Sequence, residues 1–406
     1  MKILHINNYD KKGGAETVFN LTRQNLKEFD NYSGFIKLDN SNEIPDVKFS
    51  TWENNSRLIG IINYIFSIKN YKELYKFLDK HEIDIVHIHG FFSSISPSIL
   101  LSLKKIKNKK EIKVIQTLHD FHVICPNSSL YNFNKNKLCE KCIGKNFKYY
   151  IFTDRCDRRG LFFSIIKGIR SFVANNILKH KEIIDQFITP GEFLKNKLIG
   201  DGINVEKITV IRNPIQININ NTYIKKENII CYFGRFSREK NLEFLIDAFS
   251  FWKEQNKNDF MLLLIGEGEE ELLLKNKSAQ NKFNKEIIFK SFLPADQLWE
   301  EIKICKYFAL TSKWFENAPM SILEAVSLNI LPIVPDFGGM RETIEDVIHI
   351  GKLYNANNIQ SWVNAISSLE YNYKQEILRL ISLQKKINSV LSLDYFTKKT
   401  KDIYNK

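Results

Sequence analysis

Short apolar segments and amphipathic helical patterns alternate along this chain twice over, and this alternation restricts the fold more than any other feature. In the first half the predicted strands are Lys2–Asn8, Ile83–His89, Val114–His119, Gln186–Thr189 and Ile208–Asn213. In the second half they are Ile229–Gly234, Met261–Gly266, Ile287–Phe292, Tyr307–Thr311 and Ile330–Pro335. Strands that alternate with helices form parallel sheets with both faces covered. The sequence therefore predicts an α/β fold of two Rossmann-like domains, with a ligand bound in a cleft between them at the carboxyl ends of the strands.

Length and composition agree with a two-domain enzyme of the cytoplasm. The 406 residues are 44% hydrophobic, enough for two cores. No apolar run approaches the roughly 20 residues of a membrane span. The six cysteines come without a secretory signal, which indicates a reducing compartment. The polar stretch Gln216–Glu227 is the best linker, so we expect domains at 1–215 and 216–388, followed by a terminal segment at 389–406.

Positive charge is concentrated in the first half. Residues 1–215 hold 34 Lys and Arg against 22 Asp and Glu, whereas residues 216–406 hold 25 against 24. Arg57–His81 and Leu161–Lys181 both have the pattern of a basic amphipathic helix, which favours contact with an anionic membrane surface. No nucleic-acid module is present, so we expect no nucleic-acid partner. The alternative is that the apolar stripes of these helices pack into a core and the lysines are simply solvated.

Two glutamates eight residues apart carry the strongest functional signal. Glu316 and Glu324 flank the segment N-A-P-M-S-I-L, whose proline suits the first position of a helix. The amides of Ala318, Met320 and Ser321 would then form the positive end of a helix and bind a phosphate. One carboxylate would lie beside that phosphate and the other would reach a sugar hydroxyl. Two unrelated exposed carboxylates would give the same spacing.

The loops after other predicted strands supply further candidates. They contain Gly13 and Gly14 after the first strand, His119 after the third, and Gly234, Arg235 and Lys240 after the first strand of the second half, with Gly266 and Leu293 after the next two. Paired glycines allow a backbone to approach a ligand, and two cations can neutralise a departing diphosphate. The backbone at Leu293 is placed to read a base edge. Ordinary turns and solvated loops use the same residue types.

Taken in order, five motifs resemble those of the retaining glycosyltransferases of family 4, which have the GT-B fold. They are GGAE at 13–16, TLHD at 117–120, GRFSREKN at 234–241, GEGE at 266–269 and ENAPMSILE at 316–324. The resemblance covers nearly the whole chain. It implies that Arg235 and Lys240 bind the diphosphate of a UDP- or GDP-sugar donor, that Glu316 contacts the donor sugar and that Glu324 holds the ribose.

The same resemblance assigns the remaining parts of the chain. Backbone near Leu293 is implied in base recognition, while Gly13, Gly14 and His119 are implied to line the site from the acceptor domain. The segment Tyr395–Tyr404 is similar to the terminal helix that crosses back onto the N-terminal domain in this family. The implied reaction retains the configuration of the sugar and needs no protein nucleophile. No D-x-D motif is present, so we expect no catalytic metal.

Four cysteines form a second, independent signal. Cys125, Cys139, Cys142 and Cys156 have the spacing C-x13-C-x2-C-x13-C within an expected insertion at 121–160. Four thiolates around a central C-x-x-C suit a tetrahedral structural zinc ion. The alternative is a set of reduced thiols without metal. A similar cysteine-bearing insertion occurs in a subset of family 4 enzymes that make bacterial surface polysaccharides.

These observations favour a cytoplasmic glycosyltransferase, peripheral at the inner membrane face, that acts on a lipid-linked or polysaccharide acceptor. A soluble acceptor remains open. One alternative is a nucleotide-sugar epimerase on the same fold, which would need acid–base residues beside the sugar. Another is a non-catalytic basic adaptor that binds a membrane or nucleic acid. Arg235, Lys240, Glu316 and Glu324 occurring together argue against the adaptor.

Overall fold

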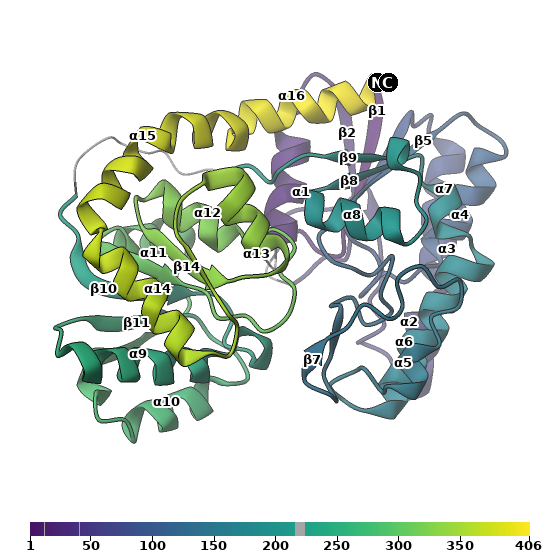
Figure 1. Cartoon of the computed structure of the whole chain (residues 1–406). Helices are drawn as coiled ribbons and strands as arrows, with labels where there is room; N and C mark the ends of the chain where they lie inside the picture. The colour runs from purple at the N-terminus through teal and green to yellow at the C-terminus, as the bar shows by residue number, and fades with distance from the viewer. Residues whose placement is uncertain (12, 40, 216–223) are drawn as a thin grey trace. The chain divides into compact units, whose positions relative to one another are not determined.

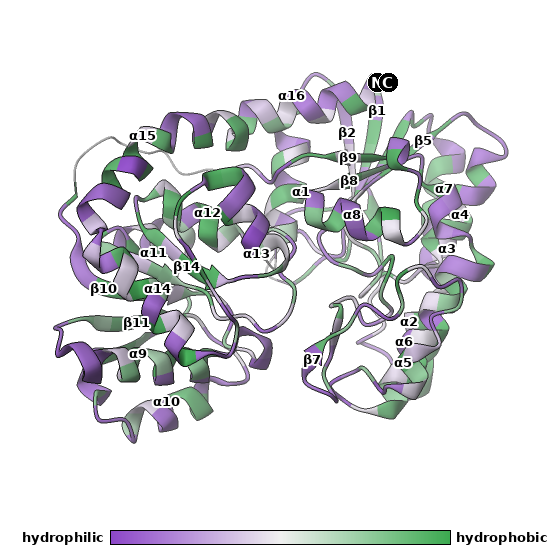
Figure 2. Ribbon diagram, in the orientation of Figure 1, coloured by the Kyte–Doolittle hydropathy of each residue, from purple (hydrophilic) through white to green (hydrophobic). Residues whose placement is uncertain are grey.

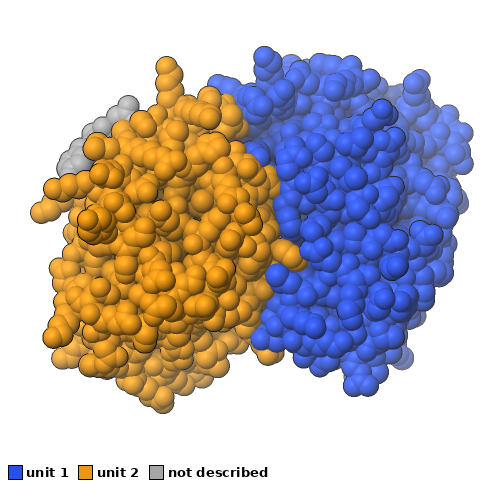
Figure 3. Space-filling view, in the orientation of Figure 1, with its two compact units in different colours: residues 1–214, 394–406 blue, residues 215–393 orange. Residues whose placement is uncertain are grey.

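The computed structural model describes residues 1–11, 13–39, 41–215 and 224–406, and it divides into two compact units. Unit 1 comprises Met1–Pro214 and Asp394–Lys406, and unit 2 comprises Ile215–Leu393 (Figure 3). Of the predicted linker, positions 216–223 lie outside the described residues, and Glu227 already begins a strand. The two units are described separately below.

Unit 1 contains a seven-stranded parallel sheet in the order β3-β2-β1-β4-β5-β8-β9 (Figure 1). Its strands are β1 (Lys2–Ile6), β2 (Asp30–Phe35), β3 (Val47–Lys48), β4 (Ile85–Ile88), β5 (Lys113–Thr117), β8 (Gln186–Thr189) and β9 (Ile208–Val210). Every residue of β4 is buried, as expected for a central strand covered on both faces. The sequence did not predict β2 and β3, because the polar residues of Asp30–Phe35 mask the strand pattern.

Helices cover this sheet, and one short hairpin lies outside it. The helices are α1 (Gly14–Gln24), α2 (Arg57–Ile65), α3 (Ile68–Lys80), α4 (Ile99–Lys107), α5 (Tyr150–Thr153), α6 (Leu161–Phe172), α7 (His180–Ile183), α8 (Glu192–Gly200) and α16 (Leu393–Tyr404). Strands β6 (Tyr131–Asn132) and β7 (Lys137–Leu138) form an antiparallel pair within the predicted insertion. No helix in the described ranges is both long and apolar enough to cross a membrane.

The prediction of two long basic helices was wrong. Arg57–His81 forms α2 and α3, which are separated where Ser67 caps the second helix by accepting a hydrogen bond from the amide of Asn70. Leu161–Lys181 forms α6, then a π-helical turn at Val173–Ile177. The helical segment is interrupted at Lys179, whose φ of +62° lies in the left-handed region. A serine N-cap begins a new helix and a left-handed residue interrupts one, and neither is visible in the hydrophobic period.

Unit 2 contains a six-stranded parallel sheet in the order β12-β11-β10-β13-β14-β15. Its strands are β10 (Glu227–Phe233), β11 (Met261–Ile265), β12 (Ile287–Lys290), β13 (Cys305–Ala309), β14 (Leu331–Pro335) and β15 (Lys352–Tyr354). Its helices are α9 (Leu242–Asn256), α10 (Glu271–Ala279), α11 (Ala295–Ile302), α12 (Met320–Ser327), α13 (Gly338–Glu342), α14 (Ile359–Tyr371) and α15 (Tyr373–Leu391). The predicted class, α/β with two Rossmann-like domains, is confirmed.

The last helix belongs to the unit that contains the N-terminus. Phe396, Ile403 and Tyr404 of α16 are buried there. The hydroxyl of Tyr404 lies 2.5 Å from Nδ1 of His87 on β4, and Nζ of Lys113 donates to the carbonyl of Ile403 (2.5 Å). These bonds attach the carboxyl end of the chain to the central strands of the unit 1 sheet.

Candidate active site

Two glycine turns form the base of the predicted donor site in unit 2. Gly234 follows β10 with a φ of +144°, and Gly266 follows β11 with a φ of +146°. A Cβ atom on Gly266 would lie 2.0 Å from the carbonyl oxygen of Gly234, so only glycine allows these turns to meet. Arg235 extends from the first turn with 60% of its side chain exposed, and it pairs with Glu269 (3.2 Å). The turn therefore presents a guanidinium to solvent.

The structure brings two predicted site residues into direct contact. Lys240 Nζ donates to Oε1 of Glu316 (2.6 Å), and the same oxygen accepts from Ser312 Oγ (2.6 Å) and Trp314 Nε1 (2.8 Å). Only 20% of the Lys240 side chain and 13% of the Glu316 side chain are exposed. Although burial acts to raise it, the pKa of Glu316 is held below its usual value by Lys240 and by these hydrogen bonds. None of the three bonds uses Oε2, which is left for a ligand.

Backbone contacts fix the loop that carries this carboxylate. The amide of Gly339 donates to the carbonyl of Glu316 (3.0 Å), and a Cβ atom on Gly339 would lie 1.8 Å from the carbonyl oxygen of Asn317. The amide of Lys313 donates to the carbonyl of Glu239 (2.9 Å), which ties the loop to the segment that carries Lys240. The pair is therefore held in place by backbone on both sides.

Helix α12 begins later than predicted. Pro319 takes the cap position rather than the first helical position, so the helix starts at Met320 and Ala318 precedes it. Among the described residues, no side chain caps this helix. Ser321 lies in its first turn, where amide groups have no acceptor within the helix. The N-terminal end of α12 still suits an anion. The amide of Ala318 would contribute from the preceding loop and not from the helix.

Glu324 is placed one turn into α12 and is half-buried. Burial raises its pKa to about 7. No hydrogen bond or ion pair satisfies its carboxylate within the part of the chain that the structure describes. A carboxylate in this state is a ready acceptor for the hydroxyls of a ligand.

The loop after β12 adds a residue that the sequence did not single out. Leu293, predicted to read the base through its backbone, packs its side chain against the hydrophobic core of unit 2. Its neighbour Phe292 is 69% exposed, and the amide of Phe292 donates to Glu267 (3.3 Å). An exposed aromatic ring beside a glycine turn can stack on a nucleobase. A single phenylalanine in an apolar strand gives no such signal in the sequence.

In unit 1, the predicted residues lie at the ends of β1 and β5. Gly13 caps α1, and Gly14 is its first residue, where an added Cβ would meet nothing within 4 Å. This end of α1 is therefore open. His119 follows β5, and burial lowers its pKa to about 4, so the ring is neutral near pH 7. Its ring stacks on that of His89, with centroids 5.8 Å apart.

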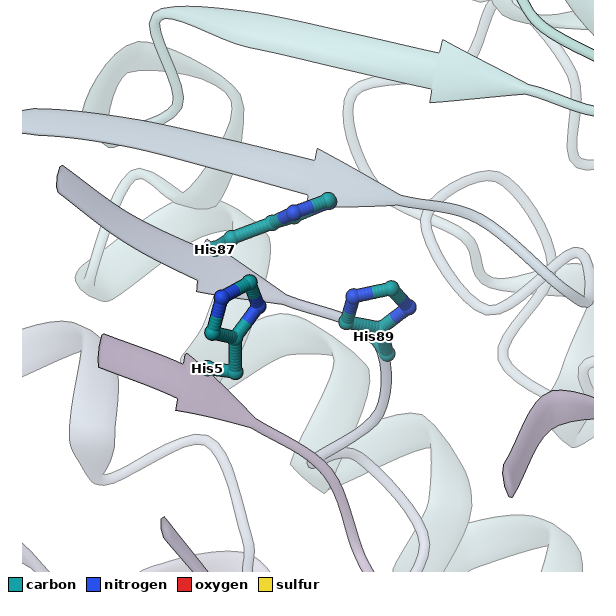
Figure 4. Close-up of side chains that lie close together, drawn as sticks. All are labelled: His5, His87 and His89. Atoms are coloured by element: carbon teal, nitrogen blue, oxygen red, sulfur yellow. The ribbon is translucent and has the colours of Figure 1, made fainter. Parts of the chain in front are cut away.

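Behind His119, a cluster of buried histidines supports this edge of the sheet. His5, His87 and His89 lie close together at the ends of β1 and β4 (Figure 4). Within the described ranges, they form the group of potential metal ligands in which one ligand atom from each residue lies within 4.8 Å of the other two. However, both ring nitrogens of His87 are hydrogen-bonded, to Tyr404 and to Thr117 (2.8 Å). We therefore assign His87 to holding α16 and β5 against β4, while His5 bonds Asn31 of β2 and, among the described residues, neither ring nitrogen of His89 has a hydrogen-bond partner.

The four predicted zinc ligands surround one small cavity. Cys125, Cys139, Cys142 and Cys156 line it, and all four are free thiols. Burial raises the pKa of Cys156 to about 12. In the described part of the chain, no three of these Sγ atoms lie within 4.8 Å of one another. The structure thus gathers the predicted ligands without bringing them to the spacing of a closed metal site.

Comparison with known proteins agrees with this architecture. Anabaena HepE in complex with UDP superposes with a TM-score of 0.69 at 15% identity, with all of both chains covered. The lipopolysaccharide outer core galactosyltransferase WaaB superposes with a TM-score of 0.66 at 19% identity, covering 100% of this chain and 99% of that one. These likenesses define the fold as that of the GT-B glycosyltransferases.

Family models identify the chain more narrowly. The model described as Glycosyltransferase Family 4 matches residues 54–218, and the model described as Glycosyl transferases group 1 matches residues 215–381. The Staphylococcus aureus capsular polysaccharide biosynthesis glycosyltransferase CapH is 23% identical over 100% of this chain and 98% of its own length. An Escherichia coli UDP-Gal:alpha-D-GlcNAc-diphosphoundecaprenol alpha-1,3-galactosyltransferase is 24% identical over 82% of this chain and 80% of its own. The chain belongs to the family 4 type of glycosyltransferases.

Proposed function

We propose that this enzyme transfers a hexosyl group, with retention of configuration, from a nucleotide-sugar to an acceptor of bacterial surface-polysaccharide synthesis. The observation that carries the proposal is the Lys240–Glu316 pair beside the uncapped start of α12. A cation, a carboxylate with one unused oxygen and a set of amide groups are what a sugar diphosphate requires. The UDP bound to Anabaena HepE favours UDP over GDP as the nucleotide.

In this proposal, each residue of unit 2 has a distinct task. Arg235 and Lys240 neutralise the charge that develops on the leaving diphosphate. Glu316 accepts a hydroxyl of the donor sugar through Oε2, and Glu324 accepts the ribose hydroxyls. No protein group forms a bond to the sugar: the acceptor hydroxyl approaches from the face that the diphosphate leaves, and a diphosphate oxygen takes its proton.

Unit 1 would supply the acceptor side. The open end of α1 at Gly13 and Gly14 leaves room for a glycan, and the neutral ring of His119 can hydrogen-bond one of its hydroxyls. We propose a lipid-linked acceptor and a cytoplasmic enzyme peripheral at the inner membrane face. The diphosphoundecaprenol acceptor named for the Escherichia coli relative and the excess of Lys and Arg in residues 1–215 support this.

We also propose that the four cysteines hold one structural zinc ion. Burial raises the pKa of Cys125, while the backbone amides of Leu130, Ser129 and Asn127 act in the opposite direction by hydrogen bonding. Backbone amides that donate hydrogen bonds to a cysteine sulfur stabilise the thiolate form that binds a metal. The ion would order residues 121–160 and take no part in the transfer. Metal analysis of purified protein that found no zinc would remove this assignment.

Nucleotide-sugar screening tests the central proposal. We expect UDP-sugars to raise the unfolding temperature and one of them to be consumed in the presence of acceptor, with the new linkage in the anomeric configuration of the donor by NMR. An epimerase would instead convert the donor without any acceptor. Turnover by Glu316→Gln or Lys240→Met at the wild-type rate would refute the site assignment.

A further inference from the structure

A cavity of about 450 Å³ in unit 1 has walls of three different chemical kinds. Helix α6 contributes a cationic and aromatic wall with Phe163, Lys167 and Arg170, and Arg159 lies just before it. Residues Glu16, Glu53 and Asp120 contribute carboxylates from other elements. Asp120 follows His119 directly in the chain, so the acidic side of the cavity adjoins the proposed catalytic histidine.

Arg170 is the unusual member of this cavity. Only 2% of the residue is exposed, and in the described ranges it makes no ion pair. One nitrogen donates to the carbonyl of Phe92 (2.7 Å), while its guanidinium lies 4.1 Å from the ring centroids of both Tyr64 and Phe92. Its buried Nε has no partner. The carboxylate of Asp120 acts on Arg170 at longer range, although it is itself paired with His122. A buried cation with no carboxylate in contact is costly, so its retention points to an anion that arrives with a ligand.

The neighbouring cations have a partner of their own. Asp157, 2% exposed, pairs with Lys167 (2.6 Å) and Arg159 (3.1 Å), and Lys167 also donates to Asn127 (2.7 Å). One buried carboxylate therefore balances two cations. Together with Arg170, this wall holds more positive than negative charge. The guanidinium, fixed between two rings, offers a planar fork that matches phosphate oxygens.

The outer faces of the same two helices are apolar and exposed. Helices α2 and α6 pack against each other, and Figure 2 shows much of both in the green of hydrophobic residues. Ile61 and Tyr64 of α2 line the cavity. On the outer faces of the two helices, the following are 37–76% exposed: Leu58, Ile59, Ile62, Leu161, Phe162, Ile165, Ile169 and Phe172. We call this set the apolar ridge.

Exposed charge in the segment that contains α6 has one sign. In residues 141–181 the exposed charged side chains are Lys141, Lys145, Arg155, Arg158, Arg159 and Lys179, and both acids of that segment are buried. Exposed apolar helix faces bordered by cations are typical of contact with anionic lipid. The ridge and the cationic wall share helix α6, and one carboxylate of the acidic wall, Asp120, directly follows His119 in the chain.

We propose that this cavity binds the glycosyl diphosphate head of a prenyl-linked acceptor, with its hydrocarbon lying over the apolar ridge in the membrane surface. The three kinds of surface match the three kinds of group in such a molecule. Its chain meets the ridge, its diphosphate meets Arg170 and Lys167, and its sugar hydroxyls meet the carboxylates next to His119. This proposal rests on the proposed function and adds the chemical class and the subsites of the acceptor.

Binding of two soluble probes to the full chain tests the assignment. By isothermal titration, we expect farnesyl diphosphate to bind at least about tenfold more tightly than inorganic pyrophosphate, because the chain covers apolar surface. Arg170→Met should weaken both probes about tenfold or more. Ile165→Glu should remove only the advantage of the farnesyl chain. Lys72→Gln, on exposed α3, is the matched control and should change neither affinity.

Thermal unfolding separates a ligand site from a structural role. If the role of Arg170 is to bind an anionic ligand, Arg170→Met should unfold at the wild-type temperature or above, because the substitution removes an unpaired buried charge. A lower unfolding temperature with unchanged pyrophosphate affinity would make Arg170 structural and overturn the proposal. Ser93→Glu adds a carboxylate at an exposed position of the same cavity, so its loss of diphosphate binding tests the site even if Arg170→Met does not fold.

UDP binding, measured in parallel, distinguishes this proposal from the one on which it rests. All four variants lie in unit 1 and should keep the wild-type affinity for UDP. If the wild-type chain binds UDP but shows no preference for farnesyl diphosphate, the acceptor subsites are wrong and the donor site stands. If UDP itself fails to bind, the proposed function fails whatever the second probe does.

Discussion

Replacing Glu324 with glutamine should stabilise the free enzyme at alkaline pH and weaken its hold on the nucleotide. Burial raises the pKa of this carboxyl from 4.5 to about 7 in the folded chain. A folded-state pKa above the unfolded-state value means that the contribution to stability is fully present below pH 4.5. It is lost as the pH rises through about 7, because the ionised carboxylate then lies half-buried without a partner.

The size of the effect follows from the two pKa values. At about 1.4 kcal/mol for each pKa unit, the shift corresponds to a ceiling of about 3 kcal/mol in unfolding free energy. The side chain is only half-buried, so solvent screening reduces the expected loss to about 1–2 kcal/mol between pH 5 and pH 8. Glu324→Gln has no ionisable group here and should not show that loss.

Urea unfolding at pH 5 and pH 8 measures this difference, with substitution of the exposed Glu243 of α9, Glu243→Gln, as the control. UDP binding supplies a second readout, because ribose hydroxyls donate to the ionised form. Wild-type affinity for UDP should therefore increase more from pH 6 to pH 8 than that of Glu324→Gln, because ionisation of the UDP phosphate itself affects both proteins equally. Parallel pH curves for all three proteins would refute the reasoning.

Three further outcomes are expected. Lys240→Met removes the cation bonded to Glu316 and should lower kcat by about 10²–10³-fold in a coupled UDP-release assay, and it should also weaken UDP binding because the same cation is proposed to face the diphosphate. Tyr404→Phe removes the hydroxyl bonded to His87 and should cost about 1 kcal/mol of stability by thermal unfolding, while UDP affinity stays unchanged. Cys139→Ser should reduce bound zinc from about one ion per chain to none by elemental analysis, and a wild-type zinc content in this variant would contradict the cysteine site.

The parallel strands could be predicted because most of them carry their own signal. A strand buried on both faces reads as a short apolar run, and Met261–Ile265 shows this clearly. Asp30–Phe35 lacked the signal, since its burial comes from β1 and β3 on either side rather than from its own composition. Helix ends were harder, because Ser67 and Lys179 end the regular pattern through one side-chain bond and one backbone angle.

Only the site residues that belong to sequence motifs could be predicted from the sequence. Spacing pointed to Lys240 and Glu316 separately, but the residues that fix the carboxylate, Ser312 and Trp314, are visible only once the loop before α12 is folded. Arg170 shows the same limit of sequence-based prediction more clearly. In the sequence it is one more cation on an amphipathic helix, and its burial depends on rings from α2 and from the loop after β4.

Glu324 and Arg170 raise the same physical question in the two units. Each is an ionisable side chain that the fold takes out of water without an ion pair among the described residues, one an acid in unit 2 and the other a base in unit 1. Free energy of folding alone would favour a neutral residue at both positions. A ligand that donates hydroxyls to the first and phosphate oxygens to the second would supply the missing partners. The cost of each unpaired charge in the free chain is therefore a measure of how strongly that site prefers to be occupied.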